Sequence, residues 1–321
     1  MKIKVSVLVS NYNYAHYLKA AINSVLNQTY RNYEIIIVDD GSTDNSQEVI
    51  KALSQKAPSQ IIPIFQENQG QGAAFNTGFD VASGEIIAFL DADDIWLPNK
   101  LQQIVEVFDS RSEIIGIIHP LNLIDKNDQL LNQGKYGWIP DENLAKIIIK
   151  TGNAWHYPPT SGLAYRRTVL KEVFPIDPIK WRLCADGCLV FCTAFLGEVI
   201  GLNQVLGSYR LHDLNNHASG NLTIEKQKRS QKGIEMTNQY LNDFLKQIQY
   251  PEKVHLSRNL SYRRTRYYLR NKCDLAEGLA ISRLILNWHF YTWRKKFNYL
   301  LRFWLKSLSF CLPSNFPKQP I

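Results

Sequence analysis

The stretch IIAFLDADDIWLPNK, residues 86–100, constrains the fold of this chain more than any other stretch. Residues 86–90 form an apolar run of the length expected for a strand buried on both faces, and Asp91, Asp93 and Asp94 follow it directly. In open α/β sheets the ligand crevice lies outside the carboxyl ends of the strands. Two carboxylates separated by one small residue can bind one hard cation, since Mg²⁺ and Mn²⁺ use one or two carboxylates together with substrate phosphates. The stretch therefore predicts a metal-bound diphosphate; an acidic loop that caps the next helix is the alternative.

Earlier segments of the chain alternate between strand and helix patterns. We expect strands at residues 5–9, 34–38 and 61–65, and helices at residues 15–28, 45–53 and 72–81. The second of these strands also ends in acids, Asp39 and Asp40. Strands that alternate with helices form a parallel sheet with right-handed crossovers, so the predicted fold class is α/β.

The glycine pattern argues against two common nucleotide folds. A dinucleotide-binding fold places Gly-x-Gly-x-x-Gly in the first strand-to-helix turn, but residues 10–14 read SNYNY and contain no glycine. Residues 70–75, GQGAAF, match that motif only partly and follow a later strand. The chain has no Walker sequence either, so hydride transfer and nucleotide hydrolysis both lose support.

Charge divides the chain into two parts. Residues 222–321 hold 19 Lys and Arg against 6 Asp and Glu, whereas residues 1–221 hold 18 against 23. We place a domain boundary near residue 220, where strand patterns give way to long helical periodicity.

The five cysteines lack paired metal-binding spacing, and Cys184, Cys188 and Cys192 are spaced for one helix face. The start lacks signal-peptide features, and no run of 18 apolar residues predicts a membrane span.

Three ordered motifs carry a resemblance to a known family. They are VSVLVSNYNYAHYLKAAINSVLNQTYRNYEIIIVDDGSTDNS, NQGQGAAFNTGF and ASGEIIAFLDADDIWLPNKL. Together they resemble the nucleotide-sugar domain of family 2 glycosyltransferases of the GT-A fold, strongly over residues 4–110 and loosely over residues 150–217. The resemblance implies a Rossmann-like, mixed and mostly parallel sheet flanked by helices. It implies a catalytic domain at residues 1–220, with a nucleotide-binding half at 1–110 and an acceptor-side half at 111–220, followed by a basic helical region at 221–321.

The same resemblance implies roles for residues at the strand ends. The donor-binding positions it implies are Val9, Ser10, Tyr12, Asp40, Asn68, Gly70, Asn76, Asp91 and Gly162. Asp40 corresponds to the acid that accepts a hydrogen bond from uracil, Asp91 to the ribose side, and Asp93 to the ligand of Mn²⁺ or Mg²⁺. Two positions depart from the family pattern: Ser10 replaces a proline, and Phe75 replaces a basic residue.

The acceptor side is implied by shorter motifs. Residues 157–167 resemble the segment under the donor sugar, where Gly162 allows close approach; a turn that needs glycine is the alternative. Residues 181–187 resemble the segment of the catalytic base, which is Asp186 here, although Ala185 stands where the family has Glu. An N-cap role is the alternative for Asp186, and Asp177 is the next candidate base. Residues 208–212, SYRLH, resemble a closing loop in which His212 reaches the metal; a purely structural histidine is the alternative.

The chain ends in a basic amphipathic pattern. Between residues 290 and 308 one helical face collects Phe290, Trp293, Phe297, Leu300, Leu301, Trp304 and Leu308. Lys295, Arg302 and Lys306 lie opposite. Two interpretations stay open: the apolar face lies on an anionic membrane, or it packs on the protein. No nucleic-acid-binding motif accompanies the charge.

The resemblance implies an inverting, metal-dependent glycosyltransferase that moves a sugar from a UDP-sugar to an acceptor hydroxyl. The expected acceptor is a carbohydrate or lipid-linked precursor in polysaccharide or glycolipid synthesis. The expected location is cytoplasmic, with peripheral association on the inner face of the membrane and no nucleic-acid partner. Two other classes remain: an inactive nucleotide-sugar-binding module, and a basic membrane-surface adaptor.

Overall fold

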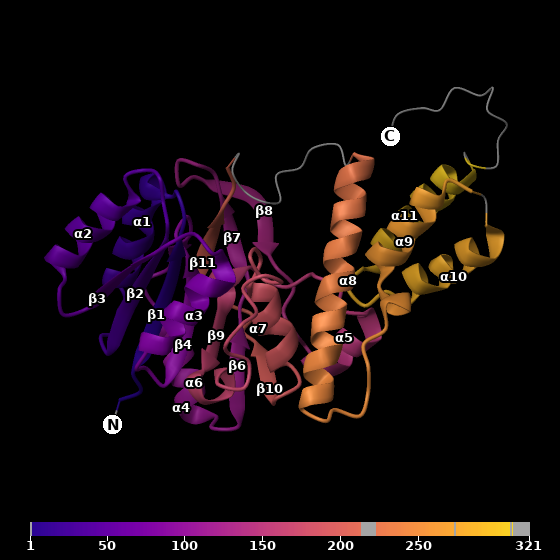
Figure 1. Ribbon diagram of the computed structural model, residues 1–321. Coiled ribbons are helices and arrows are strands. Elements are labelled where there is room, and N and C mark those ends of the chain that lie inside the picture. The colour runs from indigo at the N-terminus through magenta and orange to yellow at the C-terminus, as the bar shows by residue number, and fades with distance from the viewer. Residues whose placement is uncertain (1, 213–222, 273, 309, 311–321) are drawn as a thin grey trace. The chain divides into compact units, whose positions relative to one another are not determined.

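The computed structural model describes residues 2–212, 223–272, 274–308 and 310 (Figure 1). The chain forms two compact units. The first unit comprises Met1–Leu144 and His156–Ser219, and the second comprises Ala145–Trp155 and Gly220–Ile321. Residues 145–155, which the sequence placed in the acceptor-side half, therefore belong to the second unit.

Two sheets make up the strands of the first unit. A seven-stranded sheet has the order β10-β6-β9-β4-β1-β2-β3, and a four-stranded sheet has the order β5-β11-β7-β8. In chain order the strands are β1 Val5–Asn11, β2 Tyr33–Asp40, β3 Ile61–Gln66, β4 Ile86–Asp91, β5 Ile95–Trp96, β6 Ile114–Ile118, β7 Leu121–Ile124, β8 Leu130–Tyr136, β9 Leu163–Arg166, β10 Glu198–Gly201 and β11 Gly207–Arg210. In the large sheet only β9 pairs antiparallel, with β4 and β6. The predicted mixed, mostly parallel sheet is confirmed.

The register of the central strands aligns their carboxyl ends. β1 lies between β2 and β4, so that Ser10 pairs with both Val38 and Asp91. Asn11 pairs with Asp39, and Asp40 pairs with Gln66 of β3. The polar residues that end three neighbouring strands are thereby brought to one edge of the sheet, where α/β proteins bind ligands.

Helices cover both faces of the large sheet because its strands carry apolar residues on both sides. The helices and single helical turns of the first unit are α1 Ala15–Leu26, α2 Ser46–Lys56, α3 Gln71–Val81, α4 Lys100–Ser110, η1 Thr160–Gly162, α6 Arg167–Leu170 and α7 Asp186–Thr193. Alternate residues of β1, such as Val7, share one core with α1, α2 and α4. Leu8 points the other way, onto Gly78 of α3, where a Cβ atom would lie 2.8 Å from its Cγ.

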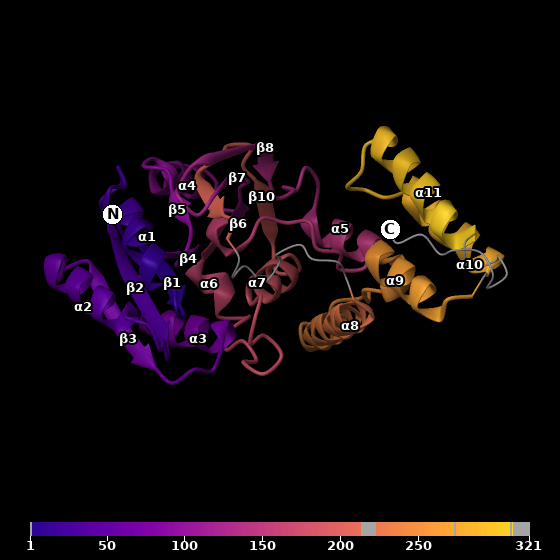
Figure 2. The same ribbon diagram turned by 90° about the horizontal axis from the view of Figure 1, so that it is seen from above.

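The second unit is helical. It contains α5 Leu144–Thr151, α8 Ile224–Gln247, η2 Leu256–Arg258, α9 Leu260–Arg270, α10 Leu275–Leu286 and α11 Trp293–Leu308. In both views α10 and α11 lie side by side (Figure 2). Tyr267, Ile281 and Phe303, from three different helices, meet in its core. Across the described part of the chain, no helix is long and apolar enough to cross a membrane.

One local prediction was wrong. Cys188 and Cys192 lie on α7 as expected, with their sulfur atoms 4.0 Å apart. Cys184, however, precedes the helix and has a φ of 58°, so that the three cysteines do not share a helix face. The reason is that α7 begins only at Asp186, and the residues before it turn back toward α3.

Candidate active site

A cavity of about 590 Å³ opens at the carboxyl ends of β1, β2 and β4. All of its lining residues belong to the first unit. They are Ser10, Asn11, Tyr12, Asn13, Tyr14, Asp40, Asn68, Gly70, Gln71, Ala74, Asp91, Ala92, Asp93, Pro159, Thr160, Arg182, Leu183, Cys184, Asp186 and Tyr209. The sheet edge that collects the polar strand ends is therefore also the wall of a cavity.

Three carboxylates form the acidic part of this site. Asp91, Asp93 and Asp94 each offer an oxygen, and these oxygens lie within 4.8 Å of one another. Burial, and then the negative charges of Asp93 and Asp94, hold the pKa of Asp91 well above its usual value. Burial and the charge of Asp93 do the same to the pKa of Asp94. Crowded, buried oxygen ligands with unfavourable negative charge fit a hard divalent cation such as Mg²⁺ or Mn²⁺.

The backbone of the acidic loop is held by Arg210 at the end of β11. Its Nε donates to the Asp93 carbonyl oxygen at 2.6 Å, and its backbone N donates to Asp94 Oδ1 at 2.9 Å. The guanidinium also pairs with Asp128. β11 belongs to the smaller sheet, so a strand of that sheet holds the loop that follows β4 of the larger one.

A buried lysine is linked to the acidic group through Ser161. Lys100, the first residue of α4, is fully buried, and its Nζ donates to the Ser161 carbonyl oxygen at 2.6 Å. The Nζ also lies 3.9 Å from the centroid of the Trp96 ring. Burial holds the pKa of Lys100 well below its usual value. Ser161 in turn accepts a hydrogen bond from the Asp91 backbone through its Oγ, at 3.0 Å.

His212, two residues after the end of β11, reaches the acidic group. Its Nε2 lies 2.9 Å from Asp93 Oδ2. The imidazole stacks on Tyr17, with ring centroids 5.0 Å apart, and meets the edge of Tyr14 at 5.6 Å. His212 and Asp93, predicted together as metal ligands, are thus neighbours, although His212 is not among the cavity-lining residues.

Asp40, at the end of β2, organises another part of the cavity wall. Its carboxylate accepts hydrogen bonds from the backbone N of Gln69 at 2.9 Å and of Gly70 at 2.7 Å. Gly70 has a φ of 95°, and a Cβ atom there would lie 2.5 Å from the Arg182 carbonyl oxygen. A glycine is therefore required by both backbone conformation and close packing. Asp39 is not a lining residue, and it accepts from Asn11 Nδ2 at 2.7 Å.

Gln71 connects the acidic group to the segment of the predicted base. Its Nε2 donates to Asp91 Oδ1 at 3.1 Å, and its Oε1 accepts from the Ala185 backbone N at 2.9 Å. The backbone N of Gln71 donates to the Arg182 carbonyl oxygen at 2.8 Å. One side chain thereby fixes the spacing between Asp91 and Asp186.

Asp186 is the first residue of α7 and faces the cavity while being 8% exposed. Burial raises its pKa to about 6. The N-cap of α7 is Ala185, and Asp186 Oδ1 accepts from the adjacent Gly187 N at 3.0 Å. Asp177, the alternative base, is not a lining residue; it accepts from the backbone N of Ile179 at 3.0 Å.

Three predicted donor-binding residues, Val9, Asn76 and Gly162, do not line the cavity. Val9 is buried between β2 and β4. Asn76 forms two hydrogen bonds with the backbone of Ile176, at 2.8 and 2.7 Å. Gly162 is packed so closely that a Cβ atom would lie 2.6 Å from the His119 carbonyl oxygen. Phe75, where the family has a basic residue, packs in the core with its ring centroid 5.0 Å from that of Phe89. The other predicted donor-binding residues line the cavity.

Sequence reasoning missed Gln71, Arg182 and Lys100. Gln71 was read only as part of a partial glycine motif, and its partners lie 20 and 114 residues away. Arg182, whose guanidinium contacts Asn68 Oδ1, belongs to a segment read for its acids alone. Lys100 ends the most informative stretch, and its position four residues after Trp96 was the available signal.

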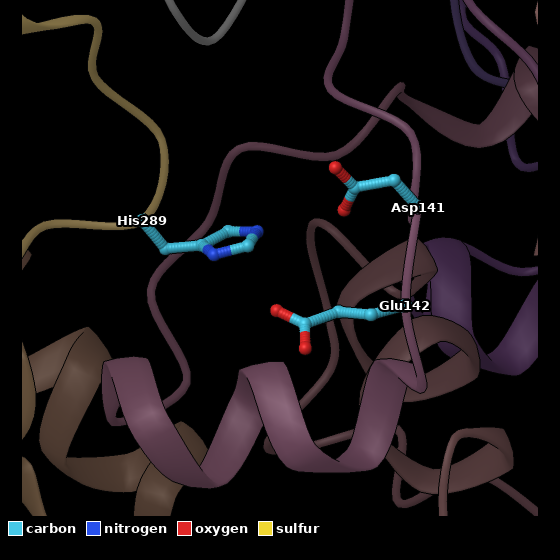
Figure 3. A group of neighbouring side chains, drawn as sticks. All are labelled: Asp141, Glu142 and His289. Carbon is cyan, nitrogen blue, oxygen red and sulfur yellow. The ribbon is translucent and has the colours of Figure 1, made fainter.

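Figure 3 shows a further group of ionisable side chains, Asp141, Glu142 and His289. Asp141 and Glu142 precede α5 and belong to the first unit, whereas His289 follows α10 in the second. The Asp91, Asp93 and Asp94 group lies within one unit.

Comparison with known proteins shows the family to which the chain belongs. The model of the family described as glycosyl transferase family 2 matches residues 6–174, more than half of the chain. An uncharacterized glycosyltransferase of Nostoc sp., alr2836, is 58% identical over 315 residues, which are 98% of each chain. The Streptococcus pneumoniae glycosyltransferase GlyG is 32% identical over 174 residues, 53% of this chain and 58% of its own length.

Two solved structures share the fold. Staphylococcus aureus TarS 1–349 in complex with UDP-GlcNAc has a TM-score of 0.56 at 18% identity, covering 96% of this chain and 89% of that one. The Pyrobaculum calidifontis mannosyltransferase PcManGT, in complex with GDP-Man and Mn²⁺, has a TM-score of 0.54 at 15% identity, covering 96% and 87%. The chain therefore belongs to glycosyl transferase family 2, has the GT-A fold and is a glycosyltransferase, as its sequence motifs predicted.

Proposed function

We propose that this enzyme is inverting and metal-dependent, and that it moves a sugar from UDP to a hydroxyl group of its acceptor. One observation carries the proposal: a single cavity is lined by Asp40, by the Asp91 and Asp93 carboxylates, and by Asp186. A nucleotide-sugar transferase needs a contact to the nucleobase, a site for the diphosphate and a general base. Asp40 is proposed to contact the nucleobase, Asp91 and Asp93 to lie at the diphosphate side, and Asp186 to act as the general base.

The donor proposal rests on the Asp40 end of the cavity. A carboxylate there can accept a hydrogen bond from the ring N–H of uracil, and the half-exposed ring of Tyr12 offers a surface on which a base can stack. TarS in complex with UDP-GlcNAc supports a uridine donor, whereas PcManGT binds GDP-Man. Guanine also has a ring N–H, so the donor test includes GDP-sugars.

The acidic group is proposed to hold the cation. Asp93 and His212 are the proposed ligands, Asp91 is proposed to face the ribose side, and Asp94 completes the buried acidic group. A bound Mn²⁺ or Mg²⁺ would supply Lewis-acid stabilisation of the negative charge on the diphosphate leaving group. The chain itself keeps these oxygens converged, because Arg210 and Gln71 fix the backbone and side chains of the loop.

Asp186 is proposed to act as the general base. Its carboxylate takes the proton of the acceptor hydroxyl while that oxygen bonds to the anomeric carbon, and the bond to UDP breaks with its electron pair leaving on the diphosphate. Attack from the face opposite the leaving group inverts the configuration and needs one base. The raised pKa of Asp186, about 6, suits a base that is ionised at neutral pH.

The proposed acceptor is a hydroxyl of a carbohydrate or of a lipid-linked precursor, used in polysaccharide or glycolipid synthesis. The proposed location is the cytoplasmic side of the membrane. An inactive nucleotide-sugar-binding module is the rival, and Ala185 in place of a family Glu favours it. That rival predicts donor affinity without turnover.

Donor hydrolysis tests the proposal without a known acceptor. The purified chain would be incubated with a panel of UDP-sugars and GDP-sugars, with Mn²⁺, with Mg²⁺ and with chelator, and the released nucleotide would be measured. We expect slow release from one or more UDP-sugars, only with metal, and lost in Asp93→Asn. UDP binding without release from any donor would favour the inactive module, and release from GDP-sugars alone would correct the donor.

A further inference from the structure

The last helix has a second apolar strip that the core of the second unit does not use. Tyr299, Leu300 and Trp304 pack with buried Phe303 in that core. The exposed strip is made up of Trp293, Phe297, Leu301, Leu305 and Leu308, which are 73%, 68%, 53%, 61% and 51% exposed. Their spacing of three or four residues places them on one helical face. Packing on the protein therefore accounts for only one of the two strips, and the exposed strip is left for the second interpretation, contact with a membrane.

The preceding helix continues the exposed strip. Leu275, Leu279 and Leu286 of α10 are 61%, 57% and 40% exposed, and their spacing also places them on one face. These three leucines and the five residues of α11 are called here the outer apolar surface. Eight large apolar side chains in solvent on two adjacent helices exceed the scattered exposure that is normal for a monomeric protein.

Both strips lie on the same side of the helix pair. The contact between the helices is made by Trp304, whose Nε1 donates to Ser282 Oγ at 2.9 Å and whose ring would lie 3.0 Å from a Cβ atom at Gly278. Around each helix the order is the buried core face, then this contact, then the exposed strip. α10 and α11 are joined by a short connection, and an antiparallel pair with this order in both members has its strips on one outer side.

Basic residues border the outer apolar surface. The α11 sequence contains five Lys and Arg and no Asp or Glu. By helical position Arg294 lies within the strip, and Arg302 and Lys295 lie farther around the helix, beyond Leu305; all three are exposed. Apolar side chains flanked by Lys and Arg, with a Trp among them, match the boundary between acyl chains and anionic headgroups. A specific protein interface would instead be depleted in lysine.

We propose that α10 and α11 dock the enzyme on an anionic lipid bilayer through the outer apolar surface. The apolar side chains enter the acyl boundary, while the long Lys and Arg side chains reach the headgroup phosphates. This inference deepens the proposed function and rests on it for one point, the lipid-linked acceptor. Docking would confine the transferase to the surface where such an acceptor is found.

Vesicle sedimentation of the full-length protein tests the docking. We expect binding to phosphatidylglycerol vesicles at low salt, weaker binding at high salt, and little binding to phosphatidylcholine vesicles. The triple variant Phe297→Gln, Leu301→Gln, Leu305→Gln should lower the partition coefficient roughly a hundredfold. The matched control Ile224→Gln, Met236→Gln changes exposed apolar residues of α8 and should leave binding unchanged.

A charge series separates the electrostatic contribution. Arg294→Gln, Lys295→Gln, Arg302→Gln should weaken binding and flatten its salt dependence, whereas Lys228→Gln, Arg229→Gln, Lys232→Gln on α8 should have little effect. Equal vesicle binding by the triple apolar variant and the wild type would overturn the proposal. A wild-type dimer that the same variant converts to a monomer, without vesicle binding, would assign the surface to a second copy.

Donor hydrolysis is measured on each variant as a separate readout. It should be unchanged, because no residue of the outer apolar surface lies in the first unit. Vesicle binding without any donor hydrolysis would leave the docking in place and reject the proposed function alone.

Discussion

Each carboxylate of the site has a distinct environment, and this separates the proposed roles. Asp93 belongs to the group of three carboxylates and lies next to His212, whereas Asp186 lies outside that group, at the start of α7, with a pKa raised by burial. A group of crowded carboxylates needs a counter-ion, whereas a single buried carboxylate can be neutralised by one proton. Metal binding and proton transfer therefore predict different responses to mutation.

Asp93→Asn should abolish the metal dependence of UDP affinity. In the wild type, UDP should bind much more tightly with Mn²⁺ than with chelator, because the cation would join the carboxylates to the diphosphate. Calorimetric titration with UDP under both conditions measures the difference. Asp177→Asn, an acid outside the cavity lining, is the matched control and should keep it. Equal UDP affinity with and without metal in the wild type would refute the assignment.

Asp186→Asn should lower turnover by roughly 10² to 10⁴ with UDP affinity nearly unchanged. In the wild type, turnover should fall about tenfold per pH unit below a pKa of about 6, because protonation removes the base. Rate profiles of the wild type against pH check this. Retained activity in the variant would move the assignment to another acid.

The same raised pKa also predicts a change in stability. A carboxyl whose pKa is higher in the folded than in the unfolded state binds a proton on folding, so its contribution falls as pH rises from about 4 to about 6. Asp186→Asn should therefore unfold at a higher temperature than the wild type at pH 8, and the gain should disappear near pH 4. A less stable variant at pH 8 would contradict a burial-raised pKa.

At the scale of residues, the sequence could predict what depends on local pattern. Asp40, Asp91 and Asp93 lie within three residues of the end of an apolar run, and the rule that places ligands at strand ends needs no knowledge of distant segments. Gln71 could not be found in this way, because its bond to Ala185 spans 114 residues. Asn76 shows the opposite case: a motif position whose side chain holds the Ile176 backbone.

At the scale of elements, the alternation of strand and helix was sufficient for the parallel part of the sheet. The antiparallel β9, which lies between β4 and β6, joins two strands distant in sequence and has no local signal. Periodicity likewise predicted that α11 is amphipathic. It placed Trp293 and Trp304 on one face, although Trp293 is exposed and Trp304 packs against α10. Which part of a wide apolar face becomes buried depends on the neighbouring helices, and the pattern of one helix does not contain that information.

Two phenylalanines of α11 turn this division into a prediction. Phe303 is 1% exposed and Phe297 is 68% exposed, and both lie on the same helix. Phe303→Ala should lower the free energy of unfolding of the second unit by about 3–5 kcal/mol, because it leaves a cavity beside Tyr267. Phe297→Ala should change it by less than about 0.5 kcal/mol. Denaturant unfolding measures both, and equal losses would contradict the assignment of two strips.

At the scale of the whole molecule, the chain crosses between its units more than once. Ala145–Trp155 leaves the first unit, joins the helical second unit and returns. There Asn259 Nδ2 donates to the Gly152 carbonyl oxygen at 2.8 Å, and Asn238 Nδ2 donates to Asn153 Oδ1 at 2.9 Å. Ile147 and Ile148 are fully buried. The two units are therefore not separable at a single point near residue 220.

This crossing predicts how truncated proteins behave. A chain cut after residue 219 keeps the cavity residues but loses the partners of residues 145–155, so buried isoleucines such as Ile147 would become exposed. We expect that protein to aggregate. The same truncation with residues 145–155 replaced by an eleven-residue Gly/Ser linker should stay monomeric and bind UDP, because the exposed apolar segment is gone and the first unit keeps its own core. Light scattering and UDP titration of both proteins measure this difference. A plain truncation that is monomeric and binds UDP as the intact chain does would show that residues 145–155 need no partner from the second unit.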